Sequence, residues 1–147
     1  MHDCARCWRT SRPAAERVLL DALRLAGGFL SVVPVRPGYD LIPTKDAIVE
    51  GVHFLPDDPL DTVAQKLLRV NLSDLAAKGA EPFGYLLACH WSPRCGWPER
   101  ELFVRGLAED QAWFDVHLLG GDTVSTPGPA AFSLTALGWT PAGRTVP

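Results

Sequence analysis

The sequence predicts a single domain of the α/β (α+β) class. Its 147 residues are about the length of one domain. Hydrophobic residues make up 47% of the chain and charged residues 21%, which is typical of a globular protein rather than a disordered one. Some segments have apolar residues at every second position, as strands do, and the segments between them have the spacing of helices. These patterns predict the order β-β-α-β-α-β-β.

Two short strands and a long helix are expected in the first half. Residues 40–45 and 48–54 have strand composition, and Asp46 would lie in a tight acidic turn between them. Asp58 is a suitable N-cap for the helix that follows, because a proline comes directly after it at the first helical position. Helical spacing of apolar residues then continues until Gly79, which is expected to end the helix.

The second half predicts three further strands and one helix. Residues 83–91 form a mostly apolar run that is typical of a buried strand, and a helix is expected over 98–114. A short strand over 116–119 would run into the sequence Gly-Gly-Asp at 120–122. Residues 132–136 alternate between apolar and hydroxyl side chains, which predicts a strand with one polar face.

Residues 1–32 differ in character from the rest of the chain. Helical spacing over 11–26 predicts a helix that ends at two glycines. Residues 1–39 carry a net charge of +3 and residues 40–147 a net charge of −6, which together give −3. We therefore expect two units: an atypical amino-terminal segment at 1–32, and a domain at 33–147.

Charge and hydropathy argue against several classes of protein. A net charge of −3 does not suggest a nucleic-acid partner. The apolar stretch from Val18 to Val33 is interrupted by Asp21 and Arg24, so it does not reach the about 20 apolar residues of a membrane span. Acidic residues near the start do not fit a transit peptide. We expect a cytoplasmic protein without a membrane partner.

Four cysteines leave a minor alternative open. Cys4 and Cys7 have the spacing of half a zinc site, but no second pair with metal-ligand spacing follows them. Cys89 and Cys95 could complete such a site only through the fold. A zinc module is therefore one hypothesis, and reduced terminal thiols without a metal are the other.

Three aspartates are the strongest candidates for chemistry. Asp46, Asp74 and Asp122 each lie among apolar residues or beside glycines, and a carboxylate in apolar company needs a partner. A shared Mg²⁺ would be an economical partner, because this ion takes oxygen ligands and bridges to phosphates. Taken singly, Asp74 could be a surface residue of a helix and Asp122 a turn residue.

The remaining motifs are weak by themselves. Gly120 and Gly121 could form an anion nest or could simply turn the chain after a strand. His53 could contact a phosphate or be structural, and His90 and His117 look structural. The sequence lacks a Walker loop, a dinucleotide fingerprint, the protein-kinase motif set and a nucleophile elbow.

Several ordered segments together resemble the thiamine-monophosphate kinase family. They are Thr-Lys-Asp-Ala at 44–47, Glu-Gly-Val-His-Phe-Leu-Pro-Asp-Asp at 50–58, Val-Asn-Leu-Ser-Asp-Leu-Ala-Ala-Lys-Gly-Ala-Glu-Pro at 70–82 and Leu-Gly-Gly-Asp-Thr at 119–123, with weaker matches at 135–138 and 143–144. The resemblance implies a fold like the amino-terminal domain of aminoimidazole ribonucleotide synthetase-like proteins. That fold has a mixed β-sheet with helices packed on one face.

The resemblance also implies an activity and a metal site. The family transfers the γ-phosphoryl group of ATP to thiamine monophosphate, which gives thiamine diphosphate. Carried over by motif, Asp46, Asp74 and Asp122 would hold Mg²⁺, with Thr44 and Lys45 beside the metal, partly through backbone oxygen. Phosphoryl transfer needs positioning and charge neutralisation, which several acid-held Mg²⁺ ions can supply.

Ligand contacts and assembly follow from the same resemblance. Gly121 and Asp122 would meet the ATP phosphates, and His53 would contact thiamine monophosphate. The amino-terminal domain of the family pairs in a homodimer. We expect two family features to be missing: an acidic Gly-Asp-Asp-Ala motif, because residues 28–33 hold no acid, and a carboxy-terminal domain.

These departures leave other functions open. A non-catalytic nucleotide-binding or dimerisation module of the same fold is one alternative to the kinase. A relative that acts on another small phosphorylated substrate is a second.

Overall fold

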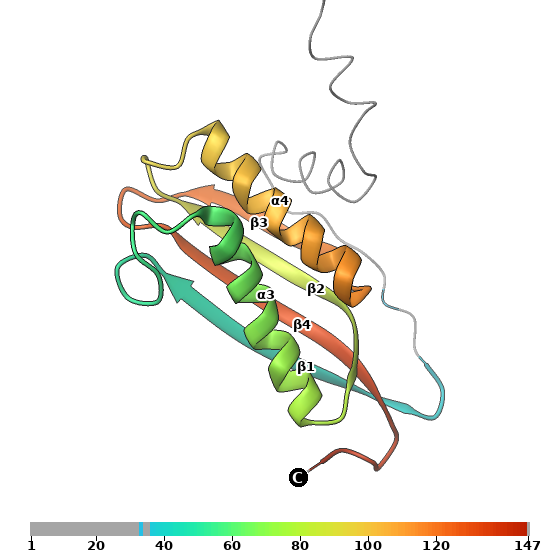
Figure 1. Ribbon diagram of the computed structural model, residues 1–147. Helices are drawn as coiled ribbons and strands as arrows, with labels where there is room; N and C mark the ends of the chain where they lie inside the picture. The colour runs from blue at the N-terminus through green and yellow to red at the C-terminus, as the bar shows by residue number, and fades with distance from the viewer. Residues whose placement is uncertain (1–32, 34–35, 147) are drawn as a thin grey trace, which may run out of the picture.

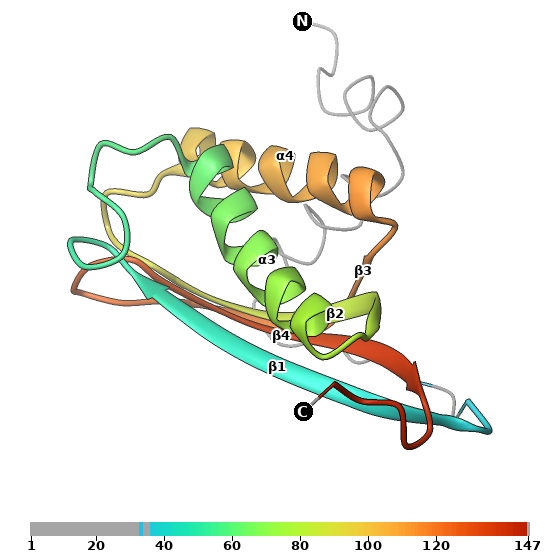
Figure 2. The same cartoon turned by 60° about the horizontal axis from the view of Figure 1, so that its bottom comes forward.

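The computed structural model describes residues 33 and 36–146, and in it two helices cover one face of a four-stranded sheet (Figure 1). Figure 2 shows both helices on the same side of the sheet, so the predicted α/β (α+β) arrangement is confirmed. The elements follow the order β-α-β-α-β-β, with the bounds β1 Tyr39–Val49, α3 Leu60–Ala77, β2 Glu81–Trp91, α4 Trp97–Phe114, β3 His117–Ser125 and β4 Ala131–Pro141.

The sheet is mixed, as expected. Its strand order is β1-β4-β2-β3, so the last strand of the chain lies between the first two. β4 pairs antiparallel with both β1 and β2, whereas β2 and β3 are parallel. β1 and β3 are therefore the two edges of this sheet. The helix α4 is the crossover that the parallel pair β2–β3 requires.

The prediction of two strands around a tight turn at Asp46 was wrong. Tyr39–Val49 is one continuous strand, and all of its residues pair with β4 without a shift in register. Asp46 lies opposite Leu134 in the middle of this ladder. The ladder of backbone hydrogen bonds outweighs the local turn preference of a single aspartate.

The start of α3 differs from the prediction, and its end agrees. Pro59, with extended backbone angles, is the N-cap residue, and no side chain caps the helix. Asp58 does not cap it, because its Oδ2 instead accepts a hydrogen bond from the backbone N–H of Leu55 at 2.7 Å. At the other end, Gly79 adopts a φ of 68°, so the predicted glycine stop is confirmed.

The Gly-Gly sequence lies inside a strand and does not form a turn. β3 extends over Gly120 and Gly121 to Ser125, beyond the predicted end at residue 119. A side chain at position 121 would place its Cβ 1.9 Å from the carbonyl oxygen of Leu87 on the neighbouring strand. The glycine is therefore required by the close approach of β2 and β3.

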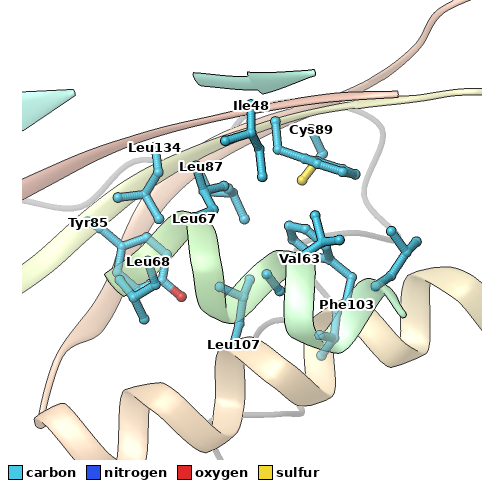
Figure 3. Close-up of a cluster of buried hydrophobic side chains, with 14 of the residues drawn as sticks. Ile48, Val63, Leu67, Leu68, Tyr85, Leu87, Cys89, Phe103, Leu107 and Leu134 are labelled. Carbon is cyan, nitrogen blue, oxygen red and sulfur yellow. The ribbon is translucent and has the colours of Figure 1, made fainter. Parts of the chain in front are cut away.

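The core lies between the sheet and the two helices. Figure 3 shows Leu67 and Leu68 of α3 and Phe103 and Leu107 of α4 directed toward the strands. Phe103 packs against Phe132 of β4 with tilted rings, 4.4 Å between their centroids, and the Trp91 ring packs edge-on against both. These contacts fix the helical layer over β2 and β4, because buried aromatic rings dominate core energetics.

An ion pair joins the two helices. Asp110 of α4 is buried, and both of its oxygens accept hydrogen bonds from the guanidinium of Arg69 on α3 at 2.8 Å. The hydrogen bonds and charge of Asp110 raise the pKa of Arg69. A buried carboxylate requires such a partner, so the pair sets how α3 and α4 lie against each other.

The helices in the described part of the chain are not long and apolar enough to cross a membrane. The predicted helix at 11–26 and the pair Cys4–Cys7 lie outside the described residues, so these predictions remain open.

The two helices approach closely at Gly106, which yields a stability prediction. A Cβ there would lie 2.2 Å from the carbonyl oxygen of Asp61 on α3. An exposed Gly→Ala change inside a helix normally stabilises by about 1 kcal/mol. We expect Gly106→Ala instead to lower the free energy of unfolding by about 1–3 kcal/mol, because the helices must separate. Urea denaturation measures this difference.

Gly128→Ala is the matched control. The nearest heavy atom to a Cβ at that position is 3.7 Å away, so the free energy of unfolding should change by less than about 0.5 kcal/mol. Equal stability of Gly106→Ala and the unmodified protein would contradict the close helix contact.

Candidate functional site

Two of the motifs meet where β1 passes beneath the carboxy-terminal half of α3. The hydroxyl of Thr44 donates a hydrogen bond to Asp74 Oδ2 at 3.0 Å, across 30 residues of sequence. Asp74 is exposed, because the buried positions of this part of the helix are Asn71, Leu72 and Leu75. Asp74 therefore contacts the Thr44 hydroxyl at the surface of the helical layer. Burial of the Asp74 charge does not explain this contact.

Asp46 lies on the same face of the sheet as Thr44. The two residues are two positions apart on β1, and alternate residues of a strand point to the same face. Their positions oppose Leu134 and Ala136, which are both buried under the helices. At the rise of a strand, the Cα atoms of Thr44 and Asp46 are about 6.6 Å apart. Thr44 thus contacts the carboxylate of Asp74 and shares the helical side of the sheet with Asp46.

The side chain of Lys45 points away from these carboxylates. Its Nζ donates hydrogen bonds to Ser133 Oγ at 2.7 Å and to Thr135 Oγ1 at 3.4 Å, both on β4. These hydroxyls lie on the face that α3 and α4 leave uncovered, which we call the open face. A metal contact of Lys45 through its backbone oxygen stays a prediction.

Asp122 is not brought to the other two aspartates within one chain. Asp122 lies on β3, opposite Ala88 of β2, and is exposed on the open face. Its Oδ1 accepts a hydrogen bond from the N–H of Thr123. Three strand spacings, about 14 Å, separate β3 from β1. The described residues hold no group of three or more potential metal ligands. The set of three aspartates therefore divides into Asp46 with Asp74, and Asp122 alone.

The Gly-Gly backbone does not form the anion nest considered from the sequence. Successive N–H groups of an extended strand point in opposite directions, and a nest needs them to converge. Contact of Gly121 with ATP phosphates remains a prediction that rests on the motif.

His53 lies in the loop after β1 with its ring oriented by the backbone. The N–H of Val49 donates to His53 Nδ1 at 3.1 Å. Because Nδ1 accepts, the neutral ring carries its proton on Nε2, which is then a hydrogen-bond donor. The ammonium of Lys66 on α3 donates to the carbonyl oxygen of His53 and ties this loop to the helix. The loop thus presents an exposed donor.

A separate pocket lies at the end of the sheet where α3 and α4 begin. It has a volume of about 220 Å³, and Phe54, Leu60 and Leu102 are among its apolar lining residues. Arg94 crosses it and pairs with Glu50 at 3.3 Å. Sequence reasoning missed this pocket. Most of its members come from the segment after β1, the first turns of α3 and α4 and the loop before α4, and only the fold brings these parts of the chain together.

Cys89 is not a candidate nucleophile. It is fully buried on β2, and burial raises the pKa of its thiol. The reactive form of a cysteine is the thiolate, which a raised pKa makes scarce.

Comparison with known proteins places this arrangement in a family. The family described as AIR synthase related protein, N-terminal domain, matches residues 28–140, which include both helices, β1 to β3 and all but the last residue of β4. The chain belongs to this family. The expected likeness to the amino-terminal domain of aminoimidazole ribonucleotide synthetase-like proteins is therefore confirmed.

Within the AIR synthase related family, this chain is similar to thiamine-monophosphate kinases. That of Caulobacter vibrioides is 62% identical over 116 residues, which cover 79% of this chain and 33% of the relative. The crystal structure of thiamine-monophosphate kinase from Stenotrophomonas maltophilia K279a matches with a TM-score of 0.72 and 35% identity, over 78% of this chain and 35% of that one. The resemblance expected from the motifs is thereby confirmed.

A further solved structure contains ligands. The structure of AaThiL complexed with AMPPCP and TMP matches with a TM-score of 0.71 and 26% identity, over 77% of this chain and 36% of that chain. The present chain spans about a third of the length of the relatives it matches.

The raised pKa of Cys89 gives a reactivity prediction. At pH 8 in the folded protein, Cys89 should be alkylated by iodoacetamide at least about tenfold more slowly than in urea, the effect of one pKa unit. Peptide mass spectrometry of samples quenched over time measures the two rates. Equal rates in both conditions would show that Cys89 is accessible and that its thiol is not buried.

Proposed function

We propose that this chain provides the nucleotide- and Mg²⁺-binding amino-terminal domain of a thiamine-monophosphate kinase. The reaction would transfer the γ-phosphoryl group of ATP to thiamine monophosphate and give thiamine diphosphate. The observation that carries the proposal is the contact of Thr44 with Asp74. It joins two distant motifs in a chain that is 62% identical to a curated kinase of this activity.

The donors around Thr44 fit a magnesium ion. Asp46 and Asp74 supply carboxylate oxygens on one face, and Mg²⁺ prefers one or two carboxylates together with phosphate oxygens and water. The Thr44 hydroxyl occupies one lone pair of Asp74 Oδ2 and thereby orients the carboxylate. When bound, Mg²⁺ would neutralise phosphate charge and hold the reacting groups in line.

The two substrates would be held by different segments. Gly121 and Asp122 would meet the phosphates of ATP, as the motif Leu-Gly-Gly-Asp-Thr at 119–123 implies. His53 would donate its Nε2–H to the phosphate of thiamine monophosphate, because Val49 already occupies Nδ1.

A homodimer would resolve the separation of Asp122 from the other aspartates. Asp46 lies at one edge of the sheet and Asp122 at the other, on opposite faces. If two copies pair open face to open face about a twofold axis parallel to the strands, β3 of each copy lies over β1 of the other. Each site would then extend around the edge strand β1, with Asp46 and Asp74 of one chain on its helical side and Asp122 of the partner on its open side. The exposed Leu41, Leu86 and Val124 supply apolar area for such pairing.

The metal assignment predicts the behaviour of two variants. We expect Asp46→Asn and Asp74→Asn each to weaken Mg²⁺-dependent binding of a non-hydrolysable ATP analogue by about 10–100-fold, since each removes a carboxylate from the cation. Calorimetric titration with and without Mg²⁺ measures this change.

Asp115→Asn is the matched control, because Asp115 is exposed beyond the end of α4 and should leave binding unchanged. Binding that is independent of Mg²⁺, or that survives both substitutions, would contradict the assignment. A folded chain that dimerises and binds no nucleotide would favour the non-catalytic module instead.

Shared sites predict complementation between two inactive variants. Asp46→Asn and Asp122→Asn homodimers should both bind the Mg²⁺-ATP analogue weakly. In an equimolar, re-equilibrated mixture, half of the dimers are mixed and each holds one intact site, so about a quarter of the tight sites should return. The number of tight sites in a calorimetric titration is the readout. No recovery in a mixture shown to exchange subunits would mean that each site lies within one chain.

A further inference from the structure

One arginine connects the two ends of the loop that carries His53. We call residues 50–58, between β1 and α3, the His53 loop. Glu50 begins this loop, and its Oε1 accepts a hydrogen bond from Arg94 Nη1 at 3.3 Å. The other terminal nitrogen of Arg94, Nη2, lies 3.5 Å from the carbonyl oxygen of Pro56, near the far end of the loop. We call this contact the Glu50–Arg94 bridge.

The carboxylate of Glu50 also connects the loop to the residue before β4. Its Oε2 accepts a hydrogen bond from the N–H of Ala130 at 2.9 Å, and the N–H of Glu50 donates to the carbonyl oxygen of Ala130 at 2.9 Å. The Glu50 side chain is only 11% exposed, so its charge needs the Arg94 partner. Each oxygen of Glu50 thus binds a different segment of the chain.

Arg94 is itself placed by a tight turn between β2 and α4. The N–H of Cys95 donates to the carbonyl oxygen of Ser92 at 3.0 Å, and the N–H of Arg94 donates to Ser92 Oγ at 3.3 Å. This turn follows directly on Trp91, which is buried in the core. Figures 1 and 2 show the turn at the same end of the molecule as the loop between β1 and α3. The bridge therefore connects the His53 loop to the hydrophobic core.

Packing gives the far end of the loop little support. The pocket of about 220 Å³ is lined by Pro56 and Asp58 of the loop and by Leu102 of α4. Within the described loop, only Phe54 is buried. Side chains that line a void lose the contacts that packing would supply, so polar contacts must hold the loop there. Arg94 crosses this pocket and makes such contacts.

The ring of His53 is oriented through Val49, the residue before Glu50. The N–H of Val49 donates to His53 Nδ1 at 3.1 Å, and the carbonyl oxygen of Val49 accepts from the N–H of His53 at 2.8 Å. Gly51, on the other side of Glu50, has a φ of 81°, so the chain reverses there. Lys66 holds the carbonyl oxygen of His53, which leaves the orientation of the ring to Val49. Movement of Glu50 would therefore move the group that orients the ring.

We propose that Glu50 and Arg94 are positioning residues that hold His53 in place for the phosphate group of the acceptor substrate. The inference rests on the proposed contact of His53 with thiamine monophosphate. Binding groups must be held within about 0.5 Å of their productive geometry, and a loop beside a pocket needs added contacts to achieve this. Both residues act through Val49 and the loop rather than on the substrate.

The first test observes the His53 ring by ¹⁵N NMR in the full chain without a ligand, at a pH where the ring is neutral. The shifts of the two ring nitrogens report which one carries the proton. We expect the Nε2–H form in the unmodified chain and a mixture of both forms in Glu50→Gln and in Arg94→Met. Exchange of the Val49 amide hydrogen should become about 3–10-fold faster in both variants, as for one weakened hydrogen bond.

Arg105→Met is the matched control. Arg105 is 54% exposed and lies 3.2 Å from Asp61, which resembles Arg94, 62% exposed and 3.3 Å from Glu50. Arg105 joins α4 to α3 outside the loop, so both readouts should stay unchanged. Arg94→Lys should lie between Arg94→Met and the unmodified chain, because an ammonium can pair with Glu50 without also reaching Pro56. Thermal melting checks that each variant folds.

The second test titrates thiamine monophosphate and the Mg²⁺-ATP analogue by calorimetry. Glu50→Gln and Arg94→Met should weaken binding of thiamine monophosphate about 3–10-fold. Binding of the analogue should stay unchanged, because the three aspartates are intact. A general loss of structure would weaken both ligands alike.

Two results would overturn the proposal. One is a His53 ring form and a Val49 exchange rate that are the same in the unmodified chain, Glu50→Gln and Arg94→Met. The other is equal weakening of the two ligands in these variants. An unmodified chain that binds no thiamine monophosphate would count against the proposed function, and the ring measurement would still decide whether the bridge positions His53.

Discussion

The pairing of β4 with both β1 and β2 is the constraint on which the other features depend. It places the last strand in the middle of the sheet and fixes the register of two neighbours at once. Because strand side chains alternate, a shift of one residue in β1 would move Thr44 and Asp46 to the open face and Lys45 under α3. The separation of carboxylates and ammonium onto opposite faces is thus a direct result of this register.

Sequence patterns predicted the elements whose signals are long. The helical spacing that ends at Gly79 and the alternation over residues 132–136 span enough positions to be decisive, and both features are present. Short signals failed. The sequence predicts a turn at Asp46 and either a turn or an anion nest at Gly120-Gly121, yet both lie inside strands. The close approach of Leu87 explains Gly121, and only the tertiary structure reveals that approach.

The sequence proposes members for the candidate site, and it does not predict how they lie relative to one another. The sequence motifs identified Thr44, Asp46, Asp74 and Asp122, and the first and third are in contact. Sequence order could not reveal that β4 and β2 separate β1 from β3. The order of the strands determines which strand lies at an edge of the sheet and which face a side chain occupies. The spacing of residues along the chain does not determine either. For the same reason the cluster of Lys45 with Ser133 and Thr135, across about 90 residues, had no signal in the sequence.

The long edge strand β1 has a consequence for the behaviour of the chain in concentrated solution. Among the residues that the structure describes, this 11-residue edge strand offers backbone groups without a strand partner, which another molecule can extend into a continuous ladder. Pro43 has no N–H to offer, and Lys45 places a charge two residues further along. Both residues lie at the centre of the strand, where they interrupt any run long enough to seed a fibril. The residues that shape the open face therefore also act as gatekeepers against aggregation.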